Sequence, residues 1–293
     1  MATDAPRQRR RARPPRSRIS PEQLAAERGA AIEGLAWLGR APEARASLFY
    51  RATRLLARAI LFGGFRFRLE TTGAEYLPAG GYLLVAGAHR GWMDPFVVIH
   101  ALPVQPRVWF LGSGPSTFTS RWREWLIRRL GGLLPVWRGG IGVELHVESA
   151  RAVIANGAVF AQMPEGTVSG PPGRLGPLRI GAGVIALRTG APIVPLAMAG
   201  TEELYLGKRM ASRILPARSV AALLGLGWDG LIPAPGSREE LELARRITDA
   251  LGAILGPVVE ALHPGTVDPP DRPRRLRRRL TWLFLRPGRL DRD

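Results

Sequence analysis

The chain has 293 residues, 46% of them hydrophobic, which is enough to bury at least one large core. It contains no cysteine, so disulfides and thiolate metal sites are excluded. The formal net charge is +18, and Lys208 is the only lysine. Residues 1–20 and 271–293 carry +6 each, which leaves +6 for everything between them. Basic ends of this kind usually act on partners rather than on the fold.

The first 63 residues precede the strand-rich part of the chain. Residues 1–20 are predicted to be a disordered basic tail, because they contain too few apolar side chains to form a core. Residues 21–63 are predicted to be helical, with one helix over 21–40 and a second over 44–62. In the second helix Leu48, Leu55 and Phe62 interleave with arginines, a pattern typical of membrane-surface helices. A helix packed on the domain with its arginines in water fits equally well.

Strands and helices then alternate, which predicts one α/β domain over residues 64–265 with a mixed, mainly parallel sheet flanked by helices. The expected strands cover 65–70, 82–87, 107–111, 158–163 and 193–199. The expected helices begin at Pro95 and cover 119–130, 144–156, 181–189 and 237–262. The basic tail 266–293 contains the run Trp282–Leu285 between arginines, which favours a membrane anchor over a solvated tail. No apolar run is long enough to span a bilayer, and no signal peptide is apparent.

The stretch AHRGWMDPF, residues 88–96, follows the apolar run 82–87. Asp94 before a proline is a good helix N-cap, and His89 is compatible with a buried structural histidine. The alternative is catalytic, because His89 leaves the carboxyl end of an inner strand, where α/β proteins place their sites. Gly91 allows a sharp turn, so the Asp94 carboxylate could orient the imidazole as a general base. The motifs GxSxG, HExxH and the Walker lysine loop are absent.

Three further segments follow in order: GLLPVWR at 132–138, PEGT at 164–167 and APIVPLA at 191–197. Together with HRGWMD at 89–94, they resemble in order and spacing the four motifs of the glycerolipid acyltransferases. The sequence is most similar to the bacterial 1-acylglycerol-3-phosphate acyltransferases. The resemblance covers about residues 65–201.

The resemblance implies roles for individual residues. His89 matches the general base that deprotonates the acceptor hydroxyl, and Asp94 matches the acid that orients it. Arg138 matches the arginine that binds the acceptor phosphate, a task that suits its planar fork of donors. Motif residues Glu165, Gly166 and Thr167 shape the acceptor site.

Pro195 matches a residue near the acyl-donor site. Each of these positions also has a structural interpretation: a turn carboxylate for Glu165, a surface arginine for Arg138 and a strand-edge proline for Pro195.

The sequence departs from the family pattern at several positions. Ala88 stands where asparagine is usual, Gly91 where serine is usual, and Val168 where the third motif commonly has an arginine. We hypothesise that Arg174 or Arg179 replaces that arginine as a phosphate contact.

The resemblance implies an O-acyltransferase that uses acyl-CoA or acyl carrier protein as co-substrate and needs no metal or cofactor. The expected acceptor is a lysophospholipid, most simply 1-acylglycerol 3-phosphate. The expected location is peripheral, on the anionic cytoplasmic face of the cell membrane, with no nucleic acid as partner. Two alternatives stay open. One is another acceptor, such as glycerol 3-phosphate, a lyso-aminolipid or a glycolipid; the other is a non-catalytic protein that binds anionic lipid or nucleic acid.

Overall fold

The computed structural model describes residues 21–113, 121–136, 143–166, 168 and 170–267. These residues form an α/β fold around a seven-stranded sheet with the strand order β1-β7-β6-β2-β5-β3-β4. The strands are β1 (Arg68–Thr72), β2 (Tyr82–Gly87), β3 (Val108–Ser113), β4 (Leu133–Val136), β5 (Val159–Gln162), β6 (Ile193–Ala199) and β7 (Arg209–Ile214). The helices are α1 (Pro21–Leu38), α2 (Leu48–Arg58), α3 (Asp94–Ala101), α5 (Arg121–Leu130), α6 (Val143–Ala155), α7 (Gly181–Thr189), α8 (Val220–Leu224) and α9 (Arg238–Leu262).

The sheet is mixed and mainly parallel, as predicted. Every strand pair is parallel except β6 with β7, which run antiparallel. All residues of β2 and β6 are buried, which explains why these strands read as continuous apolar runs rather than as alternating ones.

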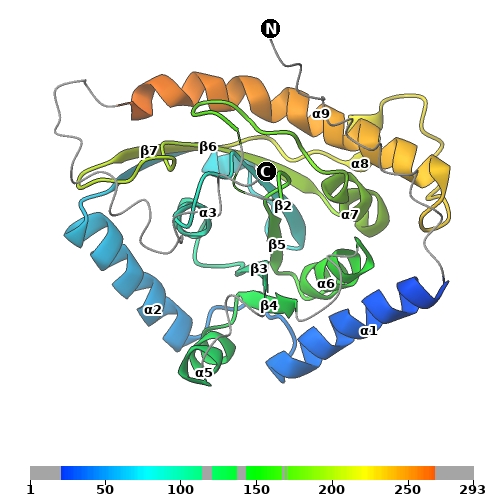
Figure 1. Ribbon diagram of the computed structural model, residues 1–293, viewed down its shortest axis with the longest axis horizontal. Coiled ribbons are helices and arrows are strands. Elements are labelled where there is room, and N and C mark those ends of the chain that lie inside the picture. Colours follow the sequence, from blue (N-terminus) through cyan, green and yellow to red (C-terminus); the bar gives the residue numbers. More distant parts are fainter. Residues whose placement is uncertain (1–20, 114–120, 137–142, 167, 169, 268–293) are drawn as a thin grey trace, which may run out of the picture.

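Helices cover both faces of the sheet (Figure 1). One core cluster joins the sheet to α6, α7, α8 and α9 and includes Leu83, Val184 and Leu251. The other cluster lies on the opposite face, where α3 and the turn after α2 pack with residues such as Val97 and Leu61. The carboxyl ends of β2 and β5 are therefore held between two packed layers.

A buried ion triad ties α6, α7 and α9 together. Arg188 on α7 donates from Nη1 to Glu144 on α6 and from Nη2 to Glu240 Oε2 on α9, the latter over 2.9 Å. Both glutamates are 1% exposed. Glu240 N also donates to Ser237 Oγ at 3.1 Å, which makes Ser237 the N-cap of α9.

Two differences from the expected elements matter. The helix expected over 44–62 begins at Leu48, after the Ser47 N-cap, and its last turn widens into a π-helix over Ala59–Gly64. The strands β4 and β7 were not expected. The sequence RMASRI of β7 alternates exposed and buried residues, but its arginines hide the apolar period.

Candidate active site

His89 and Asp94 meet at the carboxyl end of β2. Asp94 is the first residue of α3, and its Oδ2 lies 2.6 Å from His89 Nδ1. The same oxygen accepts hydrogen bonds from the backbone N–H groups of Arg90 at 2.5 Å and Gly91 at 2.8 Å. The N-cap interpretation of Asp94 is wrong, because Met93 occupies the cap and the Asp94 carboxylate instead closes the 89–94 loop. One oxygen of this buried carboxylate thus contacts three groups of the loop.

The pair leaves one nitrogen of the imidazole available for chemistry. The Asp94 side chain is fully buried, whereas the His89 side chain is 20% exposed. A carboxylate acceptor on Nδ1 favours the tautomer that carries its proton there. The lone pair of Nε2 can then accept a proton from a ligand, with Asp94 stabilising the resulting imidazolium.

Glu165, which follows β5, is tied to the histidine loop through the backbone. Its Oε2 accepts a hydrogen bond from His89 N, and its Oε1 accepts one from Gly176 N at 2.6 Å. Arg90 Nη1 lies 3.9 Å from Oε1. The side chain is fully buried, and this burial raises the pKa of the carboxyl while the two backbone hydrogen bonds and Arg90 oppose the shift. The first and third motifs thus form one hydrogen-bonded unit.

Gly166 of the third motif is exposed, and so is Arg179, which lies beside it. Gly166 has a φ of 71°, in the left-handed region that glycine adopts without strain. The Arg179 side chain lies over it, with Cδ and Nε 2.7 Å from the position that a Cβ on residue 166 would take. Arg179 Nε donates to the carbonyl oxygen of Glu165 at 3.1 Å. An exposed guanidinium therefore stands beside the residue that holds His89.

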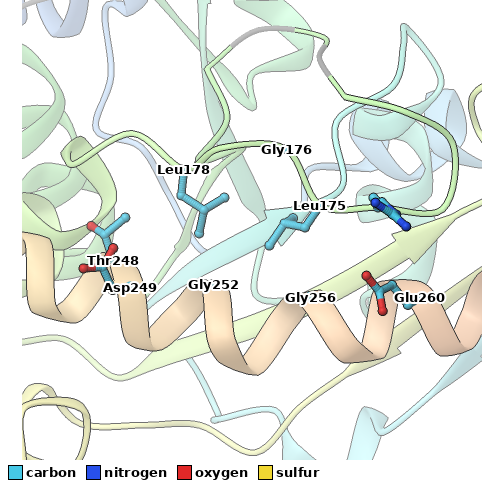
Figure 2. A pocket seen from close by; sticks show the side chains of 9 residues that line it. Leu175, Gly176, Leu178, Thr248, Asp249, Gly252, Gly256 and Glu260 are labelled. Atoms are coloured by element: carbon cyan, nitrogen blue, oxygen red, sulfur yellow. The ribbon is translucent and has the colours of Figure 1, made fainter.

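Arg174 lies elsewhere. Its carbonyl oxygen accepts a hydrogen bond from Arg90 Nη2, but its side chain lines a pocket of about 400 Å³ between the 174–178 loop and α9. Figure 2 shows Leu175 and Leu178 opposite Gly252 and Gly256 of α9 across this pocket. Asp249 and Glu260 also line it. The structure thus separates the two arginines that the sequence offers as phosphate contacts.

The remaining predicted site residues have different outcomes. Pro195 is buried in the inner strand β6, paired with Val85, so the strand-edge interpretation is wrong. Arg138 and Thr167 lie outside the described residues. The prediction that Pro195 lies near an acyl donor stays a prediction.

Arg90 was not among the site residues predicted from the sequence. It is 7% exposed and bridges the first motif to the 174–176 loop. In a chain rich in arginine, nothing in the sequence distinguishes this buried arginine from the solvent-exposed ones.

Two negative findings apply to the described part of the chain. Within it, no group of three or more histidine, aspartate or glutamate residues could hold a metal ion. Among its helices, none has the length and apolarity needed to cross a membrane.

Comparisons with known proteins agree with the motifs. Residues 68–199, from the start of β1 to the end of β6, match the family model "Acyltransferase". Among solved structures, the chain is similar to the 1-acyl-sn-glycerophosphate (LPA) acyltransferase PlsC from Thermotoga maritima. The sequences are 19% identical, the TM-score is 0.50, and the match covers 83% of this chain and 84% of that one. The family model therefore confirms the acyltransferase resemblance over residues 68–199, and the match to PlsC shows a shared fold.

Proposed function

We propose that this chain is a lysophospholipid O-acyltransferase, on the premise that its residues 68–199 match the acyltransferase family model. It moves a fatty acyl group from acyl-CoA or acyl carrier protein to a hydroxyl of the acceptor, most simply 1-acylglycerol 3-phosphate. The observation that carries this proposal is the contact between His89 and buried Asp94 at the carboxyl end of an inner strand.

The reaction needs one proton acceptor and no covalent enzyme intermediate. As the acceptor oxygen attacks the thioester carbonyl carbon, His89 Nε2 takes the hydroxyl proton, and the Asp94 carboxylate stabilises the imidazolium. The tetrahedral intermediate collapses by breaking the C–S bond. The thiolate leaves and takes the proton back from the imidazolium, so the histidine returns to its neutral state.

Glu165 acts in this mechanism as a positioning residue. Both of its carboxylate oxygens accept backbone hydrogen bonds, one of them from His89, so they are already occupied in the buried interior. We assign it the task of holding the His89 main chain rather than binding the acceptor.

Arg179 is the better placed of the two candidate phosphate contacts. In 1-acylglycerol 3-phosphate, only a few bonds separate the reacting hydroxyl from the phosphorus, so the phosphate must bind close to His89. Arg179 and His89 both hydrogen-bond to Glu165, one to its carbonyl oxygen and the other to its carboxylate. The side chain of Arg174 instead faces α9 and two carboxylates. Arg179 can therefore supply the guanidinium that Val168 does not.

We propose a peripheral location at the cytoplasmic face of the membrane, and the exposed surface of α2 and α5 supports the membrane contact. Leu48, Leu55 and Leu56 on α2 are 85%, 68% and 60% exposed, and Trp122 and Trp125 on α5 are 62% and 59% exposed. The two helices are joined by an edge-on contact between Phe49 and Trp125, with ring centroids 6.5 Å apart.

Arginines lie around this apolar surface. Arg51 and Arg58 on α2 and Arg128 and Arg129 on α5 are exposed. Apolar and indole side chains flanked by arginines suit the interface of an anionic bilayer. Of the two interpretations of the second helix, the geometry favours the membrane surface, because these leucines do not pack into the core. The tail 268–293 lies outside the described residues, and its role as an anchor stays a prediction.

Acyl transfer by the purified full-length protein tests the proposed chemistry. Labelled acyl-CoA or acyl carrier protein is offered with 1-acylglycerol 3-phosphate in mixed micelles. We expect product from the wild type and a loss of at least about a hundredfold in kcat for His89→Ala. Arg179→Gln should raise the acceptor KM about tenfold, whereas Arg174→Gln should leave it unchanged. Equal activity of wild type and His89→Ala would contradict the assignment of the base. No product from folded wild type, with any lysolipid of a panel, would overturn the proposed function.

Flotation with anionic vesicles tests the membrane surface. Leu55→Gln/Leu56→Gln should lower the bound fraction about tenfold or more, because each leucine contributes about 1.5–3 kcal/mol when buried. Leu226→Gln is the matched control, since Leu226 is fully exposed in a loop remote from α2. Unchanged flotation of the double variant would show that α2 does not insert.

A further inference from the structure

A second concave site lies at the edge of the sheet. It is a pocket of about 410 Å³ between β1, β7 and the end of α9. In Figure 1 the C-terminal end of α9, coloured orange, lies over β7 at this edge. A concave site of this size falls within the range of small-molecule sites, about 300–1,000 Å³.

The strand register gathers arginines on the floor of this pocket. Arg68 of β1 pairs directly with Arg209 of β7, and Arg213 lies farther along β7 on the same face. All three side chains are exposed. Glu70 is the one carboxylate among the residues that line the pocket, so the lining carries a formal charge of +2.

The wall of the pocket is held by the only lysine of the chain. Lys208 is 5% exposed and donates from Nζ to the carbonyl oxygen of Thr266 at 2.8 Å. This bond fixes the 3₁₀ turn His263–Thr266 against the start of β7. Gly265, which lines the pocket, faces open space.

The register also places this pocket beside the candidate active site. Ala199 of β6 pairs with Ala211 of β7, so Arg209 stands level with the residues just after β6. Gly87 of β2 pairs with Ala197 of β6, so His89 is level with Ala199, two strands away from β7 and within two residues of the level of Arg209. With strands spaced by 4.7–4.9 Å, the lateral separation is about 10 Å.

We infer that this basic pocket binds the nucleotide end of acyl-CoA. The inference rests on the proposed function, because it places the donor of that reaction. The 3′-phosphate and pyrophosphate of coenzyme A are anions for which the arginine fork is the suited partner. From this pocket, the pantetheine arm runs past the carboxyl end of β6 and delivers the thioester to His89. A carrier protein would instead need an extended interface of about 800 Å² rather than a small hollow.

Binding of adenosine 3′,5′-bisphosphate to the full-length protein tests the pocket without turnover. Calorimetry on wild type should show binding, and Arg209→Gln/Arg213→Gln should weaken it about tenfold or more. The matched control, Arg238→Gln/Arg245→Gln, removes two exposed arginines from α9 and should bind as wild type does.

Kinetics provide the second arm of the test. The pocket variant should show an acyl-CoA KM raised about tenfold, with kcat and the lysolipid KM unchanged. Wild type should prefer acyl-CoA to its dephospho form, and the pocket variant should lose that preference.

Two results would overturn the inference while the proposed function stands: equal nucleotide binding by variant and wild type, or acyl transfer from acyl-CoA by a wild type that does not bind the nucleotide. If the pocket variant bound the nucleotide as wild type does but no longer bound anionic vesicles, the pocket would be assigned to lipid headgroups instead. Arginine-dependent nucleotide binding by a protein that makes no acyl product would support the pocket and refute the proposed function.

Discussion

Replacing Glu165 by glutamine separates positioning of the histidine loop from binding of the acceptor. The side chain is fully buried and accepts backbone hydrogen bonds from His89 and Gly176. Glutamine keeps one acceptor oxygen but turns an NH₂ group toward the other N–H. One hydrogen bond to a charged group is lost, worth about 1.5–3 kcal/mol, and a buried N–H is left facing a donor. We expect a loss of about 3 kcal/mol in the free energy of unfolding, or about 6–12 °C in Tm.

Substitution of Glu165 should lower kcat rather than change the acceptor KM. A shift of His89 by about 1 Å can cost about a hundredfold in rate, so kcat should fall by that order in Glu165→Gln and Glu165→Asp. The acceptor KM should stay within about twofold, because no acceptor contact is removed. Glu242→Gln, exposed on α9, is the control and should leave both values unchanged. A raised acceptor KM with unchanged kcat would refute the positioning argument and restore Glu165 as an acceptor ligand.

Three further predictions concern stability, each measured by denaturant or thermal unfolding. Burial raises the pKa of Glu165 in the folded state. The stability that follows from this shift is fully present below the ordinary glutamate pKa and is lost as pH rises through the raised pKa. The stability difference between wild type and Glu165→Gln should therefore shrink as pH rises through that window, and a constant difference would contradict this. Gly183→Ala should cost about 3 kcal/mol or more, because its Cβ would lie 1.9 Å from the carbonyl oxygen of Ala244, whereas Gly181→Ala has open space and should be neutral or stabilising. Arg188→Met should cost about 3–5 kcal/mol by removing the cation that both buried glutamates of the ion triad contact; a loss below about 1 kcal/mol would show that the triad is not coupled.

Much of the fold follows from local pattern. The inner strands were predictable because both of their faces are buried, and α9 was predictable because Ser237 and Glu240 mark its start. β7 was not, since its pairing depends on residues far away in the chain. The π-helical turn Ala59–Gly64, whose Leu61 packs into the core, likewise has no signature in the sequence.

The candidate site, too, follows partly from local sequence pattern and partly from contacts between distant segments. From the sequence, the contact between His89 and Asp94 was one of two interpretations, because a short loop after a strand can return the chain on itself. The bonds from Glu165 to backbone N–H groups have no signature in side-chain identity. Arg174 and Arg179 are close in sequence and alike in chemistry, so only the path of the 170–180 loop distinguishes them.

The way Asp94 holds its loop bears on how this site can change over evolutionary time. The carboxylate binds the peptide N–H groups of residues 90 and 91, which every residue except proline supplies. An added Cβ at Gly91 would meet nothing closer than the carbonyl oxygen of Thr201 at 3.7 Å, an ordinary contact. Serine and glycine at this position are therefore interchangeable solutions to one backbone path. A lineage can pass between them in a single substitution without rebuilding the catalytic loop.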